Sequence, residues 1–478
     1  MIMRGGRRCF LGRHFRGLCL RRMVRKVVLI FGRRWRGWRG MCWSGTTLQV
    51  VFGYFGDIIG KVFFPPNQSG NANTMESFMV FGGAFLMRPV GGLLMGYIGD
   101  VYGRRRALYI SIFLMAWPTF LMGCLPSYET AGYFATAMLI IIRALQGMSV
   151  GGQLMTSLVF TLENVPRERW GLYGSFVWAT GNFGVLLGGL VGYALRANLD
   201  EEQLVSYGWR IPFLSGVVVS FAGFYLRAAE EGAGDADNGN DDNGANVMAS
   251  STKDSDKKSE MKKEASKSNS NPFATLFKPG NIRPLLAASM VPMIWSAGFY
   301  LSFVWMAVYM STLTDTPVPH AFAINSASLF IGVCLFFPIA GWLSDKYGRR
   351  FIMSIGGVSL AILGPTLLRS IGNGGSPLMA FVSQLFLGVC LSFWGSPMGA
   401  WLVESFEPEA RLTSVSLGYN TAHAIVGGST PALATYLVDA VGTEAPGYIY
   451  VAVALVGMIG LWVVAPPPPP QQHVARQK

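Results

Sequence analysis

Long apolar segments separated by short polar stretches run through most of the 478-residue chain. An apolar run of about 20 residues is long enough to cross a bilayer as an α-helix. The pattern therefore predicts an all-α polytopic membrane protein. We predict twelve transmembrane helices at 43–64, 76–98, 107–125, 133–161, 172–195, 209–227, 285–311, 320–343, 351–370, 378–402, 412–438 and 447–465.

One polar turn occurs twice at equivalent places between these spans. GYIGDVYGRRR at Gly96–Arg106 follows the second span, and GWLSDKYGRR at Gly341–Arg350 follows the eighth. A second landmark repeats as well, because Glu163 recurs as Glu404, 241 residues later. The repeats predict two six-helix bundles related as parallel repeats, with a substrate held near the membrane midplane between them.

Composition divides the chain into five parts. The stretch after the sixth span is first acidic and rich in Gly and Asn, and then rich in Lys and Ser, with too few apolar residues to fold. We predict it to be a disordered cytoplasmic linker, with a phosphorylatable regulatory segment as the alternative. The parts are a basic arm 1–42, a first bundle 43–227, the linker 228–283, a second bundle 284–465 and a Pro-rich tail 466–478.

The net charge of +13 belongs to the amino-terminal arm. Residues 1–45 hold 13 Lys and Arg and no acid, which leaves 26 bases and 26 acids in the remainder. No nucleic-acid partner is expected for the body of the protein. Three explanations of the arm stay open: a targeting segment, a coding sequence that starts at the wrong place, or an arm held on anionic lipid heads.

Basic residues in the short loops predict the topology. Cytoplasmic loops carry an excess of Lys and Arg, whereas the intervening loops 126–132, 312–319 and 371–377 carry none. Both termini are therefore expected in the cytoplasm. We expect a monomer in the plasma membrane, with an organelle membrane as the alternative. The basic loop residues are Arg104, Arg105, Arg106, Arg167, Arg169, Arg349 and Arg350.

Several strings resemble a known group of proteins. They include FLMRPVGGLLMGYIGD at 85–100, IRALQGMSVGG at 142–152 and GYNTAHAIVGGSTPALATYLV at 418–438. With the two repeated turns, they resemble the major facilitator superfamily and, within it, the metabolite:proton symporter family. The resemblance implies a secondary active transporter, not an enzyme, that moves a small organic acid or zwitterion, such as proline, betaine or a dicarboxylate, by alternating access. It implies a proton as coupling ion and no cofactor. A proton-independent facilitator or a non-transporting sensor is the alternative.

The repeated turn contains a candidate gating motif. An aspartate there can pair with nearby arginines and with the positive end of a helix, and glycine permits a tight turn. By resemblance, the two aspartate–arginine pairs would set the balance between outward- and inward-facing states; the alternative is a basic loop that only fixes topology. The motif residues are Gly96, Asp100, Gly103 and Arg104, with Gly341, Asp345, Gly348 and Arg349.

Two arginines and a histidine lie within predicted spans. An ionisable residue inside a membrane is costly and is functional by default, and a guanidinium matches a carboxylate. Arg143 is expected to bind an anionic substrate or to lower the pKa of a coupling acid, unless it forms a static pair with a neighbouring helix. Arg88 precedes Pro89, so it either binds substrate or satisfies the freed carbonyl. His423 either couples protons or packs through hydrogen bonds.

The first span departs from the family pattern. Members usually carry acidic residues there, whereas Gly45–Leu48 contains no carboxylate, and Gln153 stands where members often have Glu. The remaining candidates to carry a proton are Asp57, Glu76 and His423.

No cysteine pair has metal-ligand spacing, so no metal site is predicted. Candidates to line a cavity, each with packing as the alternative, are Tyr54, Gln153, Trp178, Asn182, Tyr300, Trp305, Asn325, Trp394 and Asn420.

Overall fold

The computed structural model describes residues 55–65, 80, 82–214, 276, 278–314, 316–372 and 376–466. The described residues form helices joined by short turns, with no strand among them. Eight of these helices are long and apolar enough to cross a membrane. The predicted basic arm, Tyr54, Glu76, most of the linker and the tail after residue 466 lie outside the described residues.

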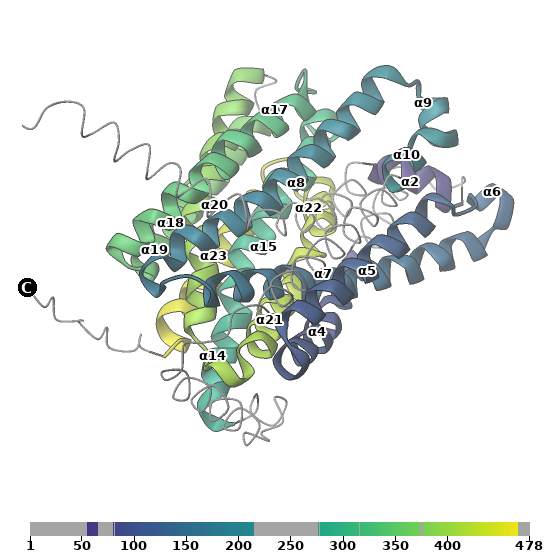
Figure 1. Cartoon of the computed structure of the whole chain (residues 1–478). Helices are drawn as coiled ribbons and strands as arrows, with labels where there is room; N and C mark the ends of the chain where they lie inside the picture. The colour runs from purple at the N-terminus through teal and green to yellow at the C-terminus, as the bar shows by residue number, and fades with distance from the viewer. Residues whose placement is uncertain are drawn as a thin grey trace, which may run out of the picture.

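The described part of the first half contains three long helices of a transmembrane bundle and several short ones (Figure 1). A 3₁₀ turn at Arg167–Arg169 leads into α8, and a π-helical turn at Leu204–Gly208 follows α9. The helices are α2 Gly56–Phe63, α4 Arg88–Tyr102, α5 Arg104–Gly123, α6 Tyr128–Ala131, α7 Tyr133–Glu163, α8 Trp170–Asn198, α9 Glu201–Gln203 and α10 Arg210–Leu214.

The second half is helical too, and π-helical turns interrupt several of its helices. Such turns are rare and frequently mark functional sites. They lie at Tyr300–Trp305, Tyr309–Leu313, Phe330–Leu335, His423–Gly427 and Gly460–Val464. The α-helices are α14 Pro279–Met290, α15 Pro292–Phe299, α16 Met306–Val308, α17 Ala321–Leu329, α18 Phe336–Tyr347, α19 Arg349–Gly372, α20 Pro377–Glu404, α21 Arg411–Ala422, α22 Thr430–Ala440 and α23 Gly447–Ile459.

The described helices lie close to the spans expected from hydropathy. The spans predicted at 133–161 and 172–195 correspond to α7 and α8, and the span predicted at 378–402 corresponds to α20. The eleventh span, predicted as one run at 412–438, is broken by the π-helical turn at His423–Gly427 and divided into α21 and α22. Hydropathy finds the length of such a helix but not a local change in its hydrogen bonding.

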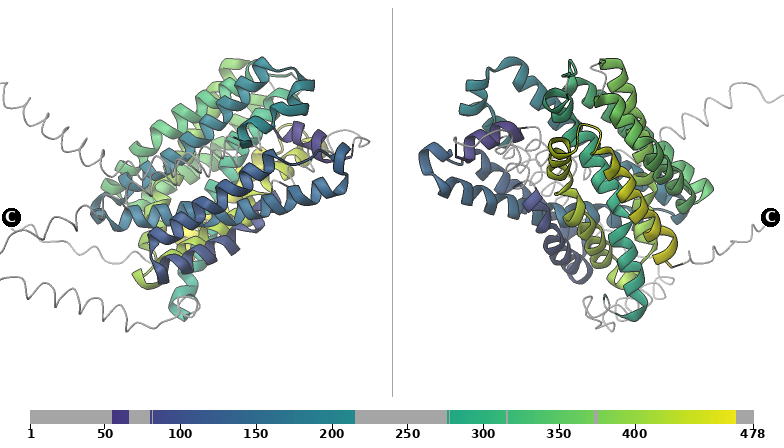
Figure 2. Two further views of the ribbon diagram at one scale, coloured as in Figure 1. Left: turned by 45° about the vertical axis from the view of Figure 1, so that its right-hand side comes forward. Right: turned by 180° about the vertical axis from the view of Figure 1, so that it is seen from behind.

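In the described part of the chain, the two halves meet mainly through α4 and α8 of the first half. α4 of the first half packs on α21, and α8 runs beside α17, α18 and α20 of the second half (Figures 1 and 2). Glycines permit these approaches: a Cβ at Gly341 would lie 2.5 Å from the carbonyl oxygen of Gly171, and one at Gly96 would lie 2.7 Å from Thr413 Cα. The backbones of the two halves therefore touch directly.

Candidate functional site

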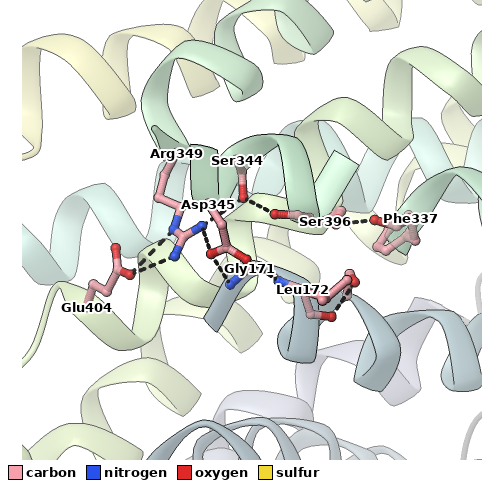
Figure 3. Close-up of polar contacts among 10 residues, drawn as sticks. Gly171, Leu172, Phe337, Ser344, Asp345, Arg349, Ser396 and Glu404 are labelled. Carbon is pink, nitrogen blue, oxygen red and sulfur yellow. Dashed lines mark hydrogen bonds and ion pairs between the residues drawn. The ribbon is translucent and has the colours of Figure 1, made fainter. Parts of the chain in front are cut away.

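The repeated turn joins the two halves through a cluster that we call the second latch: Asp345, Arg349, Glu404, Gly171 and Leu172 (Figure 3). The Asp345 carboxylate accepts hydrogen bonds from the backbone N–H groups of Gly171, at 2.9 Å, and Leu172, at 2.8 Å. These N–H groups belong to the first turn of α8, where no intrahelical acceptor is available. A carboxylate from α18 therefore caps a helix of the other half, where the helix dipole favours negative charge.

Arg349 completes the second latch from within its own half. It forms an ion pair with Asp345 at 2.5 Å, donates to the Ser344 hydroxyl at 2.9 Å and reaches Glu404 at 3.3 Å. Gly348, immediately before it, has φ +95°, a conformation that favours glycine. The turn therefore starts α19 with its arginine directed back toward the aspartate.

A pseudo-symmetric cluster, the first latch, consists of Asp100, Arg104, Glu163, Arg411 and Thr413. Asp100 pairs with Arg104 at 2.6 Å and accepts from the Thr413 backbone N–H at 2.9 Å, in the first turn of α21. The Thr413 hydroxyl donates to the same carboxylate. Gly103, with φ +100°, takes the place of Gly348. Both repeated aspartates thus cap a helix that belongs to the opposite half.

The two latches differ in one ion pair. Glu163 lies 3.4 Å from Arg104 and 3.3 Å from Arg411, so it connects both halves. The position 241 residues before Arg411 is Trp170, so within the described part of the chain the ion pair of Glu404 is with Arg349 of its own half, and the first half acts on Glu404 only through the charge of Arg167. The sequence predicted latch residues on both sides, but it did not reveal this asymmetry or the partners Gly171, Leu172 and Thr413.

A second group of polar side chains lies deeper between the halves. Arg88 precedes the latch residue Asp100 by twelve residues, and His423 follows the latch residue Arg411 by twelve. At 1.5 Å per residue, each separation is about 18 Å along the helix. Arg88 donates to the Tyr300 hydroxyl of the second half at 3.3 Å, and its guanidinium lies 3.9 Å from the centre of the Phe85 ring. We call Arg88, Arg143, Tyr300, Asn420 and His423 the central cluster.

Arg143 is held in the central cluster by a short chain of hydrogen bonds. Its Nη1 donates to Gln146 Oε1 at 2.9 Å, and Gln146 Nε2 donates to the Thr119 hydroxyl of α5 at 3.0 Å. Arg143 is 1% exposed, and its charge and that of Arg88 act on each other. The RALQG string therefore positions a buried guanidinium through a glutamine three residues further along α7.

Asn420 links α21 to the first half near the level of Arg88. Its Nδ2 donates to the Gly151 carbonyl of α7 at 2.6 Å. A Cβ at Gly151 would lie 2.2 Å from the Arg88 carbonyl oxygen, so glycine is needed for α7 to approach the helix that carries Arg88. Gln153 is also buried in α7, about 15 Å from Arg143 along the helix and nearer to the latches.

Aromatic rings surround the central cluster and cross the interface. The centre of the Trp178 ring, on α8, lies 5.8 Å from that of Trp295 and 5.5 Å from that of Tyr419, both in the second half. Asn182 is buried on the same helix, one turn further along. By contrast, Trp305, Asn325 and Trp394 make hydrogen bonds inside the second half, to Thr435, Phe303 and Val291, respectively.

Three candidates, Tyr54, Asp57 and Glu76, have side chains outside the described part of the protein. Asp57 lies in α2, but its side chain is outside the described part, and Tyr54 is outside it altogether. Among the described residues, no group of three or more His, Cys, Asp or Glu could hold a metal ion. Among the described residues, Arg88, Arg143 and His423 are buried in this region, whereas the buried carboxylate of Asp100 belongs to the first latch, where Arg104 pairs with it. The electrostatics of this region therefore favour an anion.

The match to known proteins decides the family. Residues 27–467 match the description "Sugar (and other) transporter". The chain belongs to this transporter family. The expectations of membrane transport, and of a protein that is not an enzyme, are confirmed by this membership.

Relatives of this transporter are named for the transport of organic acids, proline and betaine. It is 32% identical to the alpha-ketoglutarate permease of Escherichia coli over 85% of this chain and 87% of that protein. It is 30% identical to the citrate-proton symporter of Klebsiella pneumoniae, over 87% and 88%, respectively. It is also 30% identical to the proline/betaine transporter of Escherichia coli, over 86% and 78%. The predicted resemblance to metabolite:proton symporters is confirmed.

Solved structures confirm the predicted all-helical fold of major facilitator type. The proton:xylose symporter XylE bound to 6-bromo-6-deoxy-D-glucose matches with a TM-score of 0.67 at 20% identity, over 89% of this chain and 95% of that one. XylE from E. coli in a partially occluded inward open conformation matches with a TM-score of 0.63 at 20% identity, over 89% and 97%. At this identity the likeness concerns the fold alone.

Arg196 was not found from the sequence, and it connects the halves at the end of α8 opposite to the second latch. Its guanidinium lies 5.5 Å from the centre of the Phe55 ring in the first half and 5.4 Å from that of Phe322 in the second. The helix that begins near Phe322 ends near Asp345. The described residues of the two halves therefore meet at both ends of α8.

We expect Arg196→Gln to favour opening of this end of the protein. A cation–π contact contributes about 0.5–2 kcal/mol, so its loss should shift the conformational equilibrium roughly 2- to 30-fold. Distances between spin labels on exposed positions of α8 and α17 would measure the shift. Arg210→Gln is the matched control, because Arg210 contacts Trp209 within its own half. Equal distance distributions for Arg196→Gln and the wild type would contradict the prediction.

Proposed function

We propose that this protein is a proton-coupled symporter that moves a small organic acid or zwitterion across the membrane by alternating access. The observation that carries the proposal is a pair of buried guanidinium groups: Arg88, which bonds across the halves to Tyr300, and Arg143, whose charge interacts with that of Arg88. A guanidinium binds a carboxylate through paired charge-assisted hydrogen bonds. Alpha-ketoglutarate, citrate, proline and betaine, which the names of the relatives mention, all contain a carboxylate.

The two latches supply the other requirement of alternating access. In the described conformation, Asp100 and Asp345 each hold the first turn of a helix from the opposite half. Breaking both contacts would free this end of the two bundles to separate. We therefore infer that the latches set the balance between the states open to either side of the membrane.

The side of the membrane follows from charge. The arginine-rich turns lie at the latch end, so the positive-inside rule favours a cytoplasmic position for both latches and for both termini. The bacterial relatives favour the plasma membrane. A single copy contains both halves of the central cluster, which supports a monomer as the transporting unit.

Uptake into proteoliposomes tests the proposal. With an acidic exterior, we expect accumulation of at least one labelled compound among 2-oxoglutarate, citrate, proline and betaine, and about tenfold less without the gradient, because a pH difference of one unit supplies about 1.4 kcal/mol per proton. Xylose is the control substrate without a carboxylate. Uptake that ignores the gradient would contradict proton symport and favour a facilitator. Uptake of xylose alone would contradict a carboxylate site.

A further inference from the structure

His423 occupies a special place in the eleventh span. It begins the π-helical turn His423–Gly427, which interrupts the helix between α21 and α22, and it is 2% exposed. Its Nδ1 lies 3.1 Å from the Tyr419 carbonyl oxygen. Because a carbonyl oxygen only accepts hydrogen bonds, Nδ1 carries the hydrogen of the neutral ring, and Nε2 has the lone pair that can take a proton.

Three elements pack against this turn, and they present few groups that titrate. From α4, Arg88 acts on His423 through its charge. From the helix that continues α15, the Tyr300 ring lies 6.4 Å from the imidazole, and α15 itself has no titratable side chain. From α21, the Tyr419 ring lies 4.1 Å from it. The described surroundings of His423 are thus one cation and two phenols.

The chemistry of these groups singles out the histidine. Arginine stays charged and a phenol stays neutral near pH 7, whereas imidazole is the side chain whose charge ordinarily changes between pH 5 and 8. Among the ionisable groups of the central cluster, His423 is therefore the one suited to take up and release a proton during a transport cycle.

Arg88 makes this protonation conditional. An imidazolium next to a buried guanidinium adds like charges in a medium of low dielectric constant, which is unfavourable without an anion between them. A bound carboxylate supplies that anion. We infer that His423 is the proton-binding residue of the symport, and that the charge of Arg88 allows its protonation only when the carboxylate of the substrate is bound. This inference rests on the proposed function.

The charges balance at the binding site. One carboxylate group of the substrate enters beside Arg88, and one proton adds to Nε2 of His423, so that these two charges cancel; any further charged group of the substrate is carried in addition. When the carboxylate leaves on the other side, repulsion between Arg88 and the imidazolium releases the proton there. Neither partner crosses efficiently without the other, which is what tight coupling requires.

His423→Gln tests the inference, because the glutamine amide can still donate a hydrogen bond but does not titrate. In proteoliposomes we expect gradient-driven accumulation of the substrate to fall at least tenfold, to the level seen without a gradient. Exchange of labelled for unlabelled substrate needs no net proton movement, so it should stay within about threefold of the wild type. His320→Asn is the matched control, since His320 lies on an exposed turn with φ 59°, which asparagine tolerates.

The outcomes separate this inference from the proposed function. If substrate uptake by the wild type does not depend on the pH gradient, both the proposed function and the assignment of His423 are overturned. If the wild type is driven by the gradient and His423→Gln accumulates substrate equally well, the proposed function stands and the assignment of His423 is wrong.

A binding measurement decides the case in which the variant loses exchange as well. In weak buffer, substrate binding to the detergent-solubilised wild type should take up about one proton per molecule, and binding to His423→Gln should take up none. Binding without proton uptake in the wild type overturns the inference, as does unchanged uptake in the variant.

Discussion

Replacing Arg143 with methionine is expected to lower substrate uptake at least 100-fold while leaving the melting temperature unchanged or higher. The guanidinium is buried and is held by Gln146, and the charge of Arg88 acts on it. Charged hydrogen bonds contribute about 1.5–3 kcal/mol each, so losing two of them to a carboxylate accounts for a decrease of this size. An apolar side chain of similar length removes both the repulsion by Arg88 and the cost of burying a charge, and these gains offset the loss of the hydrogen bond to the buried Gln146.

The melting temperature distinguishes this role from a structural one. If Arg143 formed a static ion pair that supports the fold, its replacement would leave a buried partner unpaired, at a cost of about 3–5 kcal/mol, and the protein would melt several degrees lower. Uptake per milligram of reconstituted protein and thermal unfolding in detergent should therefore be measured on the same preparations.

Two further variants refine the interpretation. Arg143→Lys should recover little of the uptake, because an ammonium lacks the planar fork that binds a carboxylate at two points. Arg369→Lys is the matched control, since Arg369 pairs with Glu444 at an exposed site. Wild-type uptake by Arg143→Lys would show that only a positive charge is needed at this position.

The sequence predicted the scaffold well because its signals are local. Apolar runs show directly where helices lie, and the repeated turn contains both the aspartate and the arginine of each latch. Contacts across the interface could not be predicted in this way. That Asp345 bonds to Gly171 and Leu172 depends on how α18 meets α8, which no spacing within either helix encodes.

In the central cluster, too, some residues could be predicted from the sequence and their contacts could not. Arg143, Arg88 and His423 attract notice because charge is rare in membrane spans. Their common neighbour Tyr300, by contrast, is one of 17 Tyr residues in the chain, and the sequence offered it only as one of nine candidates to line a cavity, with packing as the alternative. Arg196 escaped notice because it lies near a predicted span end, where a basic residue ordinarily reaches toward water.

The second prediction of large effect concerns the second latch. Asp345→Asn should shift the conformational equilibrium toward separation of the latch ends by about 10- to 100-fold. The amide has one acceptor oxygen where the carboxylate has two, so it cannot accept from both Gly171 and Leu172 and also pair with Arg349. Loss of one charge-assisted hydrogen bond contributes about 1.5–3 kcal/mol, which corresponds to that shift.

Spin labels at the exposed residues Glu168 and Lys346, one in each half beside the second latch, would report the change as a population at longer distances. Asp100→Asn should produce a smaller shift, because Glu163 continues to connect Arg104 with Arg411 across the first latch. Asp439→Asn, at an exposed position of α22, should leave the distances unchanged. A shift of equal size for Asp100→Asn and Asp345→Asn would mean that the Glu163 bridge contributes nothing. No shift for Asp345→Asn would show that the glycine-mediated packing of Gly171 on Gly341, rather than the carboxylate, holds this end of the transporter together.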